Sequence, residues 1–309
     1  MGVYQIGEVI KRTRESLGIT QMDLCDGICS VETLSKIENG KRKPNRANFQ
    51  ALMERLGKSG ERYLPFVHSE EVSVIKEVMN VSTLISRYRY QELDNILNNI
   101  ERKLDLTDNI NRQFILKTRA VTDYFLKRID IATKRKQLIE AFLCTVKGYK
   151  NGELPKGIYS RHEIIIFCNI ASSYAQEGNY DTAIRMLRQV EHYFNTTNIN
   201  IEERAISETL LLSNLGQTLG IKGDTKEAIK ITKRAIEICL KEGVSNILDS
   251  LLYNFAFGKE ILREDVKACK ELLLQAYFIA ELNDAKYMLN HIKNHIRKKY
   301  YNEVERNHL

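Results

Sequence analysis

The sequence predicts an all-α protein in two parts, a small N-terminal helix-turn-helix domain followed by a right-handed α-solenoid of paired helices. Helix breakers are rare, since 309 residues hold only three prolines and sixteen glycines. From about residue 69, apolar residues recur with the i, i+3, i+4 spacing of amphipathic helices. Three later segments also align with one another without gaps. We place the first domain and its linker at residues 1–64 and the repeat domain at 65–309.

The composition is that of an ordinary soluble globular protein, with 43% hydrophobic and 28% charged residues. The net charge of +7 is compatible with a polyanionic partner but is spread along the chain. No run of 18 apolar residues and no signal peptide occurs. None of the six cysteines forms a CxxC pair, so we interpret them as reduced thiols of a cytoplasmic protein.

The sequence shows no arrangement typical of an enzyme. We find no nucleophile beside a base, no phosphate-binding loop and no metal-ligand cluster. His291 and His295 have the i, i+4 spacing of a metal pair, but no third ligand stands near them. The prediction is therefore a protein without catalytic residues, metal or cofactor.

The first domain divides into four short helices. Ile6, Val9, Ile10 and Leu17 share one face of the first helix, which Gly18 ends. Thr20 is a good N-cap for a second helix that starts at Gln21 and breaks at Gly27. Ser30 caps a third helix over 31–39, Gly40 stops it, and a fourth covers about 45–56.

The third helix has a small polar outer face that suits the major groove of DNA. Its Leu34 and Ile37 point to the core, which leaves four side chains to meet base edges: Val31, Glu32, Thr33 and Lys36. Lysine donates to guanine, glutamate accepts from cytosine, and Val or Thr contacts a thymine methyl. The phosphate backbone would be held by Gln21, Asn39, Lys41, Arg42 and Lys43.

Residues 18–44 carry the motifs GITQ, SKIENG and KP. These motifs resemble the helix-turn-helix of the Xre/Cro repressor family over about 55 residues. The resemblance implies a structural ion pair between Arg14 of the first helix and Glu38. The turn LCDGICS is one residue shorter than the usual pattern, which leaves the base-reading positions open.

An internal repeat organises the second domain. Segments 167–187, 212–232 and 252–272 share an Asn fourteen residues before an Ala, with a small residue (Ala171, Gly216 or Ala256) two positions after the Asn. Gly178 and Gly223 suit the turn inside their pairs, where the third segment has Arg263. The pattern resembles degenerate tetratricopeptide repeats, which implies a concave face that binds extended peptides. We expect a last helix over 286–305.

The repeated asparagines are the main candidates for ligand contact. A side-chain amide both donates and accepts, so Asn169, Asn214 and Asn254 can pair with a peptide bond of any sequence. The alternative is that the repeat consensus itself favours Asn there. Further candidates one turn along are Ser172, Gln176, Gln217, Tyr253 and Phe257, with core packing equally open for the two aromatic residues.

Together the two domains resemble the Rgg/PlcR family of bacterial quorum-sensing regulators over essentially the whole chain. The resemblance implies a homodimer that binds double-stranded DNA and is controlled by a short signalling peptide. It also implies a basic residue near the first repeats that holds the peptide, here Arg87 or Arg89. The alternative is an Xre-type repressor whose repeats dock a partner protein without a peptide signal.

Overall fold

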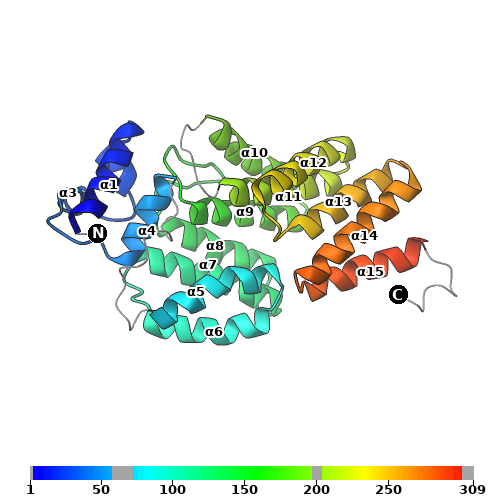
Figure 1. The fold of residues 1–309 in the computed structure, drawn as a ribbon, viewed down its shortest axis with the longest axis horizontal. Coiled ribbons are helices and arrows are strands. Elements are labelled where there is room, and N and C mark those ends of the chain that lie inside the picture. The colour runs from blue at the N-terminus through cyan, green and yellow to red at the C-terminus, as the bar shows by residue number, and fades with distance from the viewer. Residues whose placement is uncertain (1–2, 58–71, 197–203, 301–309) are drawn as a thin grey trace. The chain divides into compact units, whose positions relative to one another are not determined.

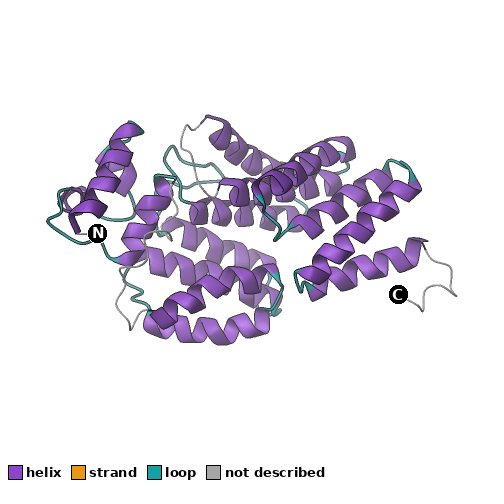
Figure 2. Cartoon of the chain, viewed as in Figure 1, coloured by secondary structure: helices purple, strands orange, loops and turns teal. Residues whose placement is uncertain are grey.

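The computed structural model describes residues 3–57, 72–196 and 204–300. All the regular elements in these ranges are helices (Figures 1 and 2), and the one isolated β-bridge, between Lys150 and Glu153, extends into no strand. The predicted all-α fold is therefore confirmed. None of the described helices is long and apolar enough to cross a membrane.

The N-terminal domain contains the four predicted helices: α1 (Val3–Ser16), α2 (Gln21–Cys25), α3 (Val31–Glu38) and α4 (Arg46–Arg55). Each cap acts as its sequence indicates, because Thr20 accepts from the Asp23 N–H and Ser30 accepts from the Thr33 N–H. The helices enclose a fully buried apolar core that includes Ile10, Leu24, Leu34, Ile37 and Leu52.

The remaining helices follow one another as pairs with a final single helix. They are α5 (Val72–Ser86) and α6 (Tyr90–Lys103), α7 (Asn109–Phe125) and α8 (Ile131–Leu143), α9 (Arg161–Gln176) and α10 (Tyr180–Thr196), α11 (Arg204–Lys222) and α12 (Thr225–Glu242), α13 (Leu248–Ile261) and α14 (Val266–Leu282), and α15 (Lys286–Tyr300). Of the predicted last helix, 301–305 lies outside the described residues.

The turns inside the five pairs have the same geometry. One residue in each takes a left-handed backbone: Tyr88, Lys127, Gly178, Gly223 and Arg263, with φ between 56° and 105°. The next N–H then bonds a carbonyl five residues back, as in Asn179 N to Tyr174 O at 2.9 Å and Glu264 N to Lys259 O at 3.0 Å. The predicted turn role of the glycines is confirmed, and Arg263 adopts the same conformation without being glycine.

The small repeat residues are all buried, and one lies where the helices of its pair touch. A Cβ on Gly216 would lie 2.6 Å from the Thr232 Oγ1, so α11 and α12 approach closely at this glycine. Ala171 and Ala256 are fully buried. The packing role predicted for the small residue two positions after each asparagine is thus confirmed for Gly216.

The chain forms two compact units. The first contains α1–α4, the start of α5, most of α6, and α7–α10. The second contains the end of α5, the start of α6, most of α11, and α12–α15. Helix α4 packs against α7 inside the first unit. The boundary predicted at residues 64 and 65 lies outside the described residues.

Candidate nucleic-acid interface and repeat-domain site

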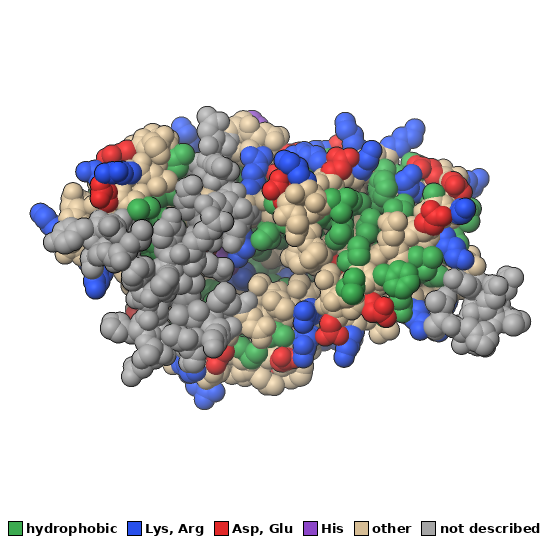
Figure 3. Space-filling view, viewed as in Figure 1, with side chains coloured by type: hydrophobic (Ala, Val, Ile, Leu, Met, Phe, Trp, Pro, Cys, Tyr) green, Lys and Arg blue, Asp and Glu red, His purple; other side chains and the backbone are tan. Residues whose placement is uncertain are grey.

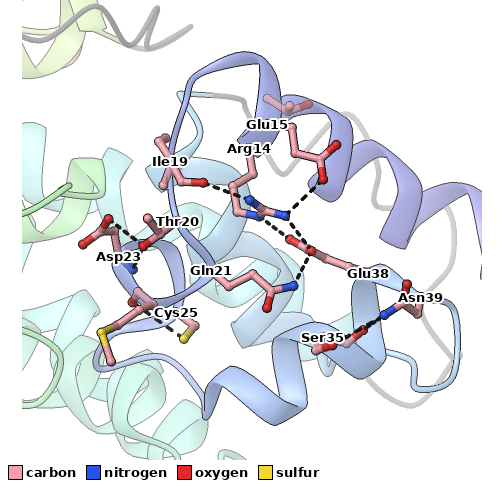
Figure 4. Close-up of polar contacts among 12 residues, drawn as sticks. Arg14, Glu15, Ile19, Thr20, Gln21, Asp23, Cys25, Ser35, Glu38 and Asn39 are labelled. Atoms are coloured by element: carbon pink, nitrogen blue, oxygen red, sulfur yellow. Dashed lines mark hydrogen bonds and ion pairs between the residues drawn. The ribbon is translucent and has the colours of Figure 1, made fainter.

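A buried ion pair fixes the helix-turn-helix from inside (Figure 4). Arg14 Nε donates to Glu38 Oε1 at 2.6 Å and Arg14 Nη2 to Glu38 Oε2 at 3.0 Å, while Arg14 Nη1 reaches the Ile19 carbonyl. The hydrogen bond to Glu38 raises the pKa of Arg14. The predicted Arg14–Glu38 pair is thus confirmed. Gln21 also donates to Glu38, at 2.7 Å, so its side-chain nitrogen already has a partner, and its phosphate contact stays a prediction.

The four predicted base readers lie on one side of α3. Val31, Glu32 and Lys36 are exposed and Thr33 is half-buried beneath the Ser30 hydroxyl, which donates to it at 2.9 Å. Lys36 Nζ lies 2.7 Å from Glu32 Oε1, and this contact lowers the pKa of Glu32. In the predicted base contact, Lys36 would exchange this exposed partner for a base edge, which costs little at a surface.

The predicted phosphate contacts follow directly after α3. Asn39, Lys41, Arg42 and Lys43 are all exposed. The N–H groups of Lys41 and Arg42 both bond the Lys36 carbonyl, which fixes the loop to the end of the helix. In the described ranges no carboxylate pairs with Lys41, Arg42 or Lys43. Within the described part of the chain, three cations thus flank the outer face of α3 without a carboxylate partner, and their phosphate contacts stay a prediction.

The three repeat asparagines occupy equivalent positions, each nine residues before its turn residue. All three are half-buried. Asn169 belongs to the first unit, whereas Asn214 and Asn254 belong to the second. Asn214 Nδ2 is shielded from solvent and has no hydrogen-bond partner among the described residues. A buried donor without an acceptor costs about 1–3 kcal/mol, so Asn214 has bonding capacity that a ligand would satisfy.

The polar neighbours on α9 and α11 differ in their contacts. Gln176 accepts from the Tyr124 hydroxyl at 2.8 Å and donates to Ser172 at 3.3 Å, so these two candidates bond each other. Gln217 is exposed on α11. Their role in peptide binding stays a prediction.

The aromatic candidates of α13 meet α15 inside the second unit. Tyr253 packs against the rings of His291 and His295, and its hydroxyl lies 3.4 Å from His295 Nδ1. Phe257 lies beside His295 and keeps 43% of its surface exposed. His295 Nε2 also lies 2.9 Å from Glu260 Oε2. The described residues hold no group of three or more metal-ligating side chains.

The turn between α5 and α6 adjoins the start of α15 in the second unit. A small cavity of about 180 Å³ is lined by Arg87, Tyr88, Arg89, Asp284, Lys286 and Tyr287. Tyr88 and Tyr287 stack with ring centroids 4.7 Å apart. Arg89 pairs with Glu92 at 2.5 Å, so of the two arginines proposed from the sequence, Arg87 is the one without an ion-pair partner among the described residues.

Sequence reasoning missed a second buried ion pair, between Arg55 of α4 and Glu163 of α9. Their side chains are only 4% and 3% exposed, with Arg55 Nη2 at 2.9 Å from Glu163 Oε1. The partners stand 108 residues apart. Local spacing could not reveal such a pair. The only sequence signal was a charged residue at the end of an otherwise core-facing segment, LMERL.

The family models match both parts of the chain. A helix-turn-helix model matches residues 10–62, and the RNPP family C-terminal domain matches residues 78–301. No curated protein matches the sequence.

Solved structures of similar fold come from bacterial proteins. Bacillus thuringiensis PlcR in complex with the peptide PapR7 and DNA is 20% identical with a TM-score of 0.63, and covers 94% of this chain and 99% of its own. The apo form of that protein has a TM-score of 0.56 at 20% identity, covering 94% and 98%. ComR from S. thermophilus, in complex with DNA and its signalling peptide ComS, has a TM-score of 0.50 at 15% identity, covering 94% and 97%. These likenesses show a common fold.

Proposed function

Because the chain belongs to the RNPP family, we propose that it is a DNA-binding transcription regulator controlled by a short signalling peptide. The family match agrees with the Rgg/PlcR resemblance predicted from the sequence. One of the similar folds described above is that of a protein in complex with a peptide and DNA. Both matched parts then act as binding modules, and we propose no catalytic role for the chain.

The outer side of α3 is the feature that best supports DNA binding. It presents exposed Val31, Glu32 and Lys36 and is followed by three cations without a carboxylate partner in the described ranges. A short helix with this face enters the major groove, and the adjacent cations neutralise phosphates.

The repeated asparagine is the feature that best supports peptide binding. Three equivalent half-buried amides, one of which has a buried donor without a partner among the described residues, suit the backbone of an extended peptide. Arg87, which has no ion-pair partner in the described ranges, adds a cation for an acidic group of the ligand.

We further propose that the protein acts in the cytoplasm, the compartment that holds bacterial DNA. We also propose that it forms a homodimer. In the second unit, large apolar side chains are exposed on the last helices, among them Val266, Phe278 and Leu282 at 67%, 56% and 85%. Figure 3 shows hydrophobic side chains gathering over α13 and α14. Such a surface is typical of an interface between subunits.

DNA binding is tested with Lys36→Ala in a gel-shift assay on duplexes that the wild-type protein selects from a randomised pool. We expect about tenfold weaker binding or more, since a bidentate base contact contributes about 1–3 kcal/mol. Lys233→Ala is the matched control, because Lys233 forms the same kind of exposed i, i+4 pair with Glu237 on α12. Equal affinity of Lys36→Ala and wild type would remove Lys36 from the recognition face.

Peptide binding is tested by calorimetry with synthetic peptides encoded beside the gene. Asn169→Ala and Asn214→Ala should each weaken the binding of an active peptide about tenfold, the loss expected for a desolvated hydrogen-bonding pair. Asn290→Ala, at an exposed position of α15, should leave it unchanged. If no peptide binds while a partner protein does, the repeats belong to a repressor regulated by protein docking.

A further inference from the structure

Inside the first unit, the turn that precedes α3 packs against a segment of the repeat domain. Gly27 has φ +72°, and a Cβ built there would lie 1.8 Å from the Thr145 carbonyl oxygen. No side chain fits at this point, so the turn meets the segment after α8 backbone to backbone. The short LCDGICS turn thus has a second partner outside the N-terminal domain.

Arg55 fastens this turn from the other side. Its Nη1 donates to the carbonyls of Leu24, at 3.2 Å, and Asp26, the residues at the end of α2. Its Nη2 donates to Glu163 Oε1 at the first turn of α9. A guanidinium has several donors in a fixed plane, so one side chain holds the turn and the carboxylate together.

Glu163 is itself firmly held. Its Oε2 accepts from the Ser160 N–H at 2.7 Å, which completes a capping box at the start of α9, and its Oε1 accepts from the Thr145 hydroxyl at 2.6 Å. Gln113 of α7 in turn donates to Thr145 at 2.6 Å. A connected buried network therefore runs from the turn before α3 to α7 and α9.

Weaker contacts surround this network on α4. Glu54 lies 3.7 Å from His162, and Asn45 Nδ2 donates to Asp108 at 3.3 Å. A buried ion pair is weak evidence for stability, since desolvation offsets most of the attraction, but it fixes relative orientation because every alternative arrangement leaves a charge buried and unpaired. The physical role of Arg55 and Glu163 is thus one of orientation.

We propose that Arg55 is a positioning residue for DNA recognition: through Glu163 it fixes the turn before α3 to α9, so that the repeat domain sets the orientation in which the helix-turn-helix meets DNA. The inference rests on the proposed function. It makes α9, which also carries Asn169, the element whose displacement is passed to the recognition helix.

The consequence concerns paired half-sites. In a dimer, binding of one N-terminal domain to its half-site brings the second domain to the other half-site at high effective concentration. If both domains are held in a fixed orientation, this occurs at only one distance between the half-sites. An N-terminal domain that can rotate freely keeps its contacts to a single half-site but loses the preference for one half-site spacing. Spacing dependence therefore separates positioning from a general loss of stability.

Two variants loosen the contact by different means. Glu163→Gln removes the charge that holds Arg55 and keeps one acceptor oxygen, for either the Ser160 N–H or the Thr145 hydroxyl. Gly27→Ala pushes the turn from Thr145 without touching the ion pair. Their controls are Glu140→Gln, which breaks the exposed Arg112–Glu140 pair between α7 and α8, and Gly18→Ala, which strains another left-handed glycine, at φ +66°, with nothing within 4 Å of the added Cβ.

The probe is duplex DNA selected by the wild-type protein from a randomised pool, tested as a single half-site and as paired half-sites with spacing changed one base pair at a time. We expect both variants to bind the single half-site within about twofold of wild type, to bind the best paired site about tenfold more weakly, and to lose most of the spacing preference. The controls should keep the wild-type profile. The amide of Cys29, which bonds the Cys25 carbonyl, should exchange faster in both variants.

A wild-type spacing profile in both variants would overturn the inference. An equal loss on single and paired sites would also overturn it, because that result indicates a general defect of the N-terminal domain. If the wild-type protein selects no duplex at all, the proposed function fails, and the inference with it.

Discussion

Glu38 receives hydrogen bonds from two side chains at the buried centre of the N-terminal domain. Arg14 and Gln21 both donate to its carboxylate, and only 1% of its side chain is exposed. Since Arg14 also holds the Ile19 carbonyl, this one acid joins α1, α3 and the turn between α1 and α2. A buried charge with so many donors contributes through the cost of leaving its partners unpaired.

Glu38→Gln should therefore lower the free energy of unfolding by about 3 kcal/mol, because the Arg14 guanidinium stays buried beside a neutral amide. Chemical denaturation monitored by circular dichroism measures this. Glu32→Gln is the control, since the solvent-exposed Glu32–Lys36 pair should leave the free energy of unfolding nearly unchanged. Equal stability of the two variants would contradict the structural role of Glu38.

Lys117 is a buried amine in α7 whose clearest partner is the ring of Phe114, at 5.3 Å. Burial, assisted by the charge of Arg161, lowers the pKa of Lys117 to about 8. The unfolded chain binds this proton more tightly, so the group destabilises the fold below pH 8, and the penalty disappears as the pH rises from about 8 to 10.5.

Lys117→Met, which fills the same space without a charge, should raise the free energy of unfolding at pH 7 by about 2 kcal/mol. The gain over wild type should shrink toward zero near pH 10.5. Thermal melts of both proteins across this range check the prediction. A gain independent of pH would mean that packing, and not the charge, accounts for the difference.

At the scale of elements, the repeated turn is the feature that sequence reasoning identified best. Gly178 and Gly223 marked it directly, and the Thr20 and Ser30 caps marked the helices of the first domain. Tyr88 and Lys127 escaped notice because their left-handed backbone is imposed by the helices on either side, against the preference of the residue itself. The only sign of the Arg55–Glu163 pair was a charged residue in the segment LMERL, since contacts between distant helices leave no local period.

Arg263→Gly should stabilise the protein by up to about 1 kcal/mol, because glycine takes the φ of +56° at this turn without steric cost. Gly178→Ala tests the reverse, since nothing lies within 4 Å of its added Cβ and only backbone strain remains. Differential scanning calorimetry should place the melting temperatures of the two variants on opposite sides of wild type. A destabilised Arg263→Gly would show that the arginine side chain contributes more than its backbone costs.

For the whole molecule, we propose that one chain joins two binding events. The α3 face and its following cations would meet DNA, and the repeat asparagines would meet a peptide. A peptide alters DNA binding only if it prefers one arrangement of the recognition helices over another. The sequence predicted both modules and their family, because these depend on short motifs and on a repeat. It could not predict how the modules are joined, which depends on buried contacts such as Gly27 with Thr145.

The proposed function requires that peptide binding and DNA binding are coupled, and linkage makes this coupling measurable from either side. The direct measurement is fluorescence anisotropy of a selected duplex, titrated with the protein in the presence and absence of saturating synthetic peptide encoded beside the gene. We predict that one such peptide changes the apparent DNA affinity about fivefold or more in wild type, and leaves it unchanged in an Asn169→Ala, Asn214→Ala double variant that still binds the duplex. Unchanged DNA affinity in wild type with a peptide that calorimetry shows to be bound would contradict the account.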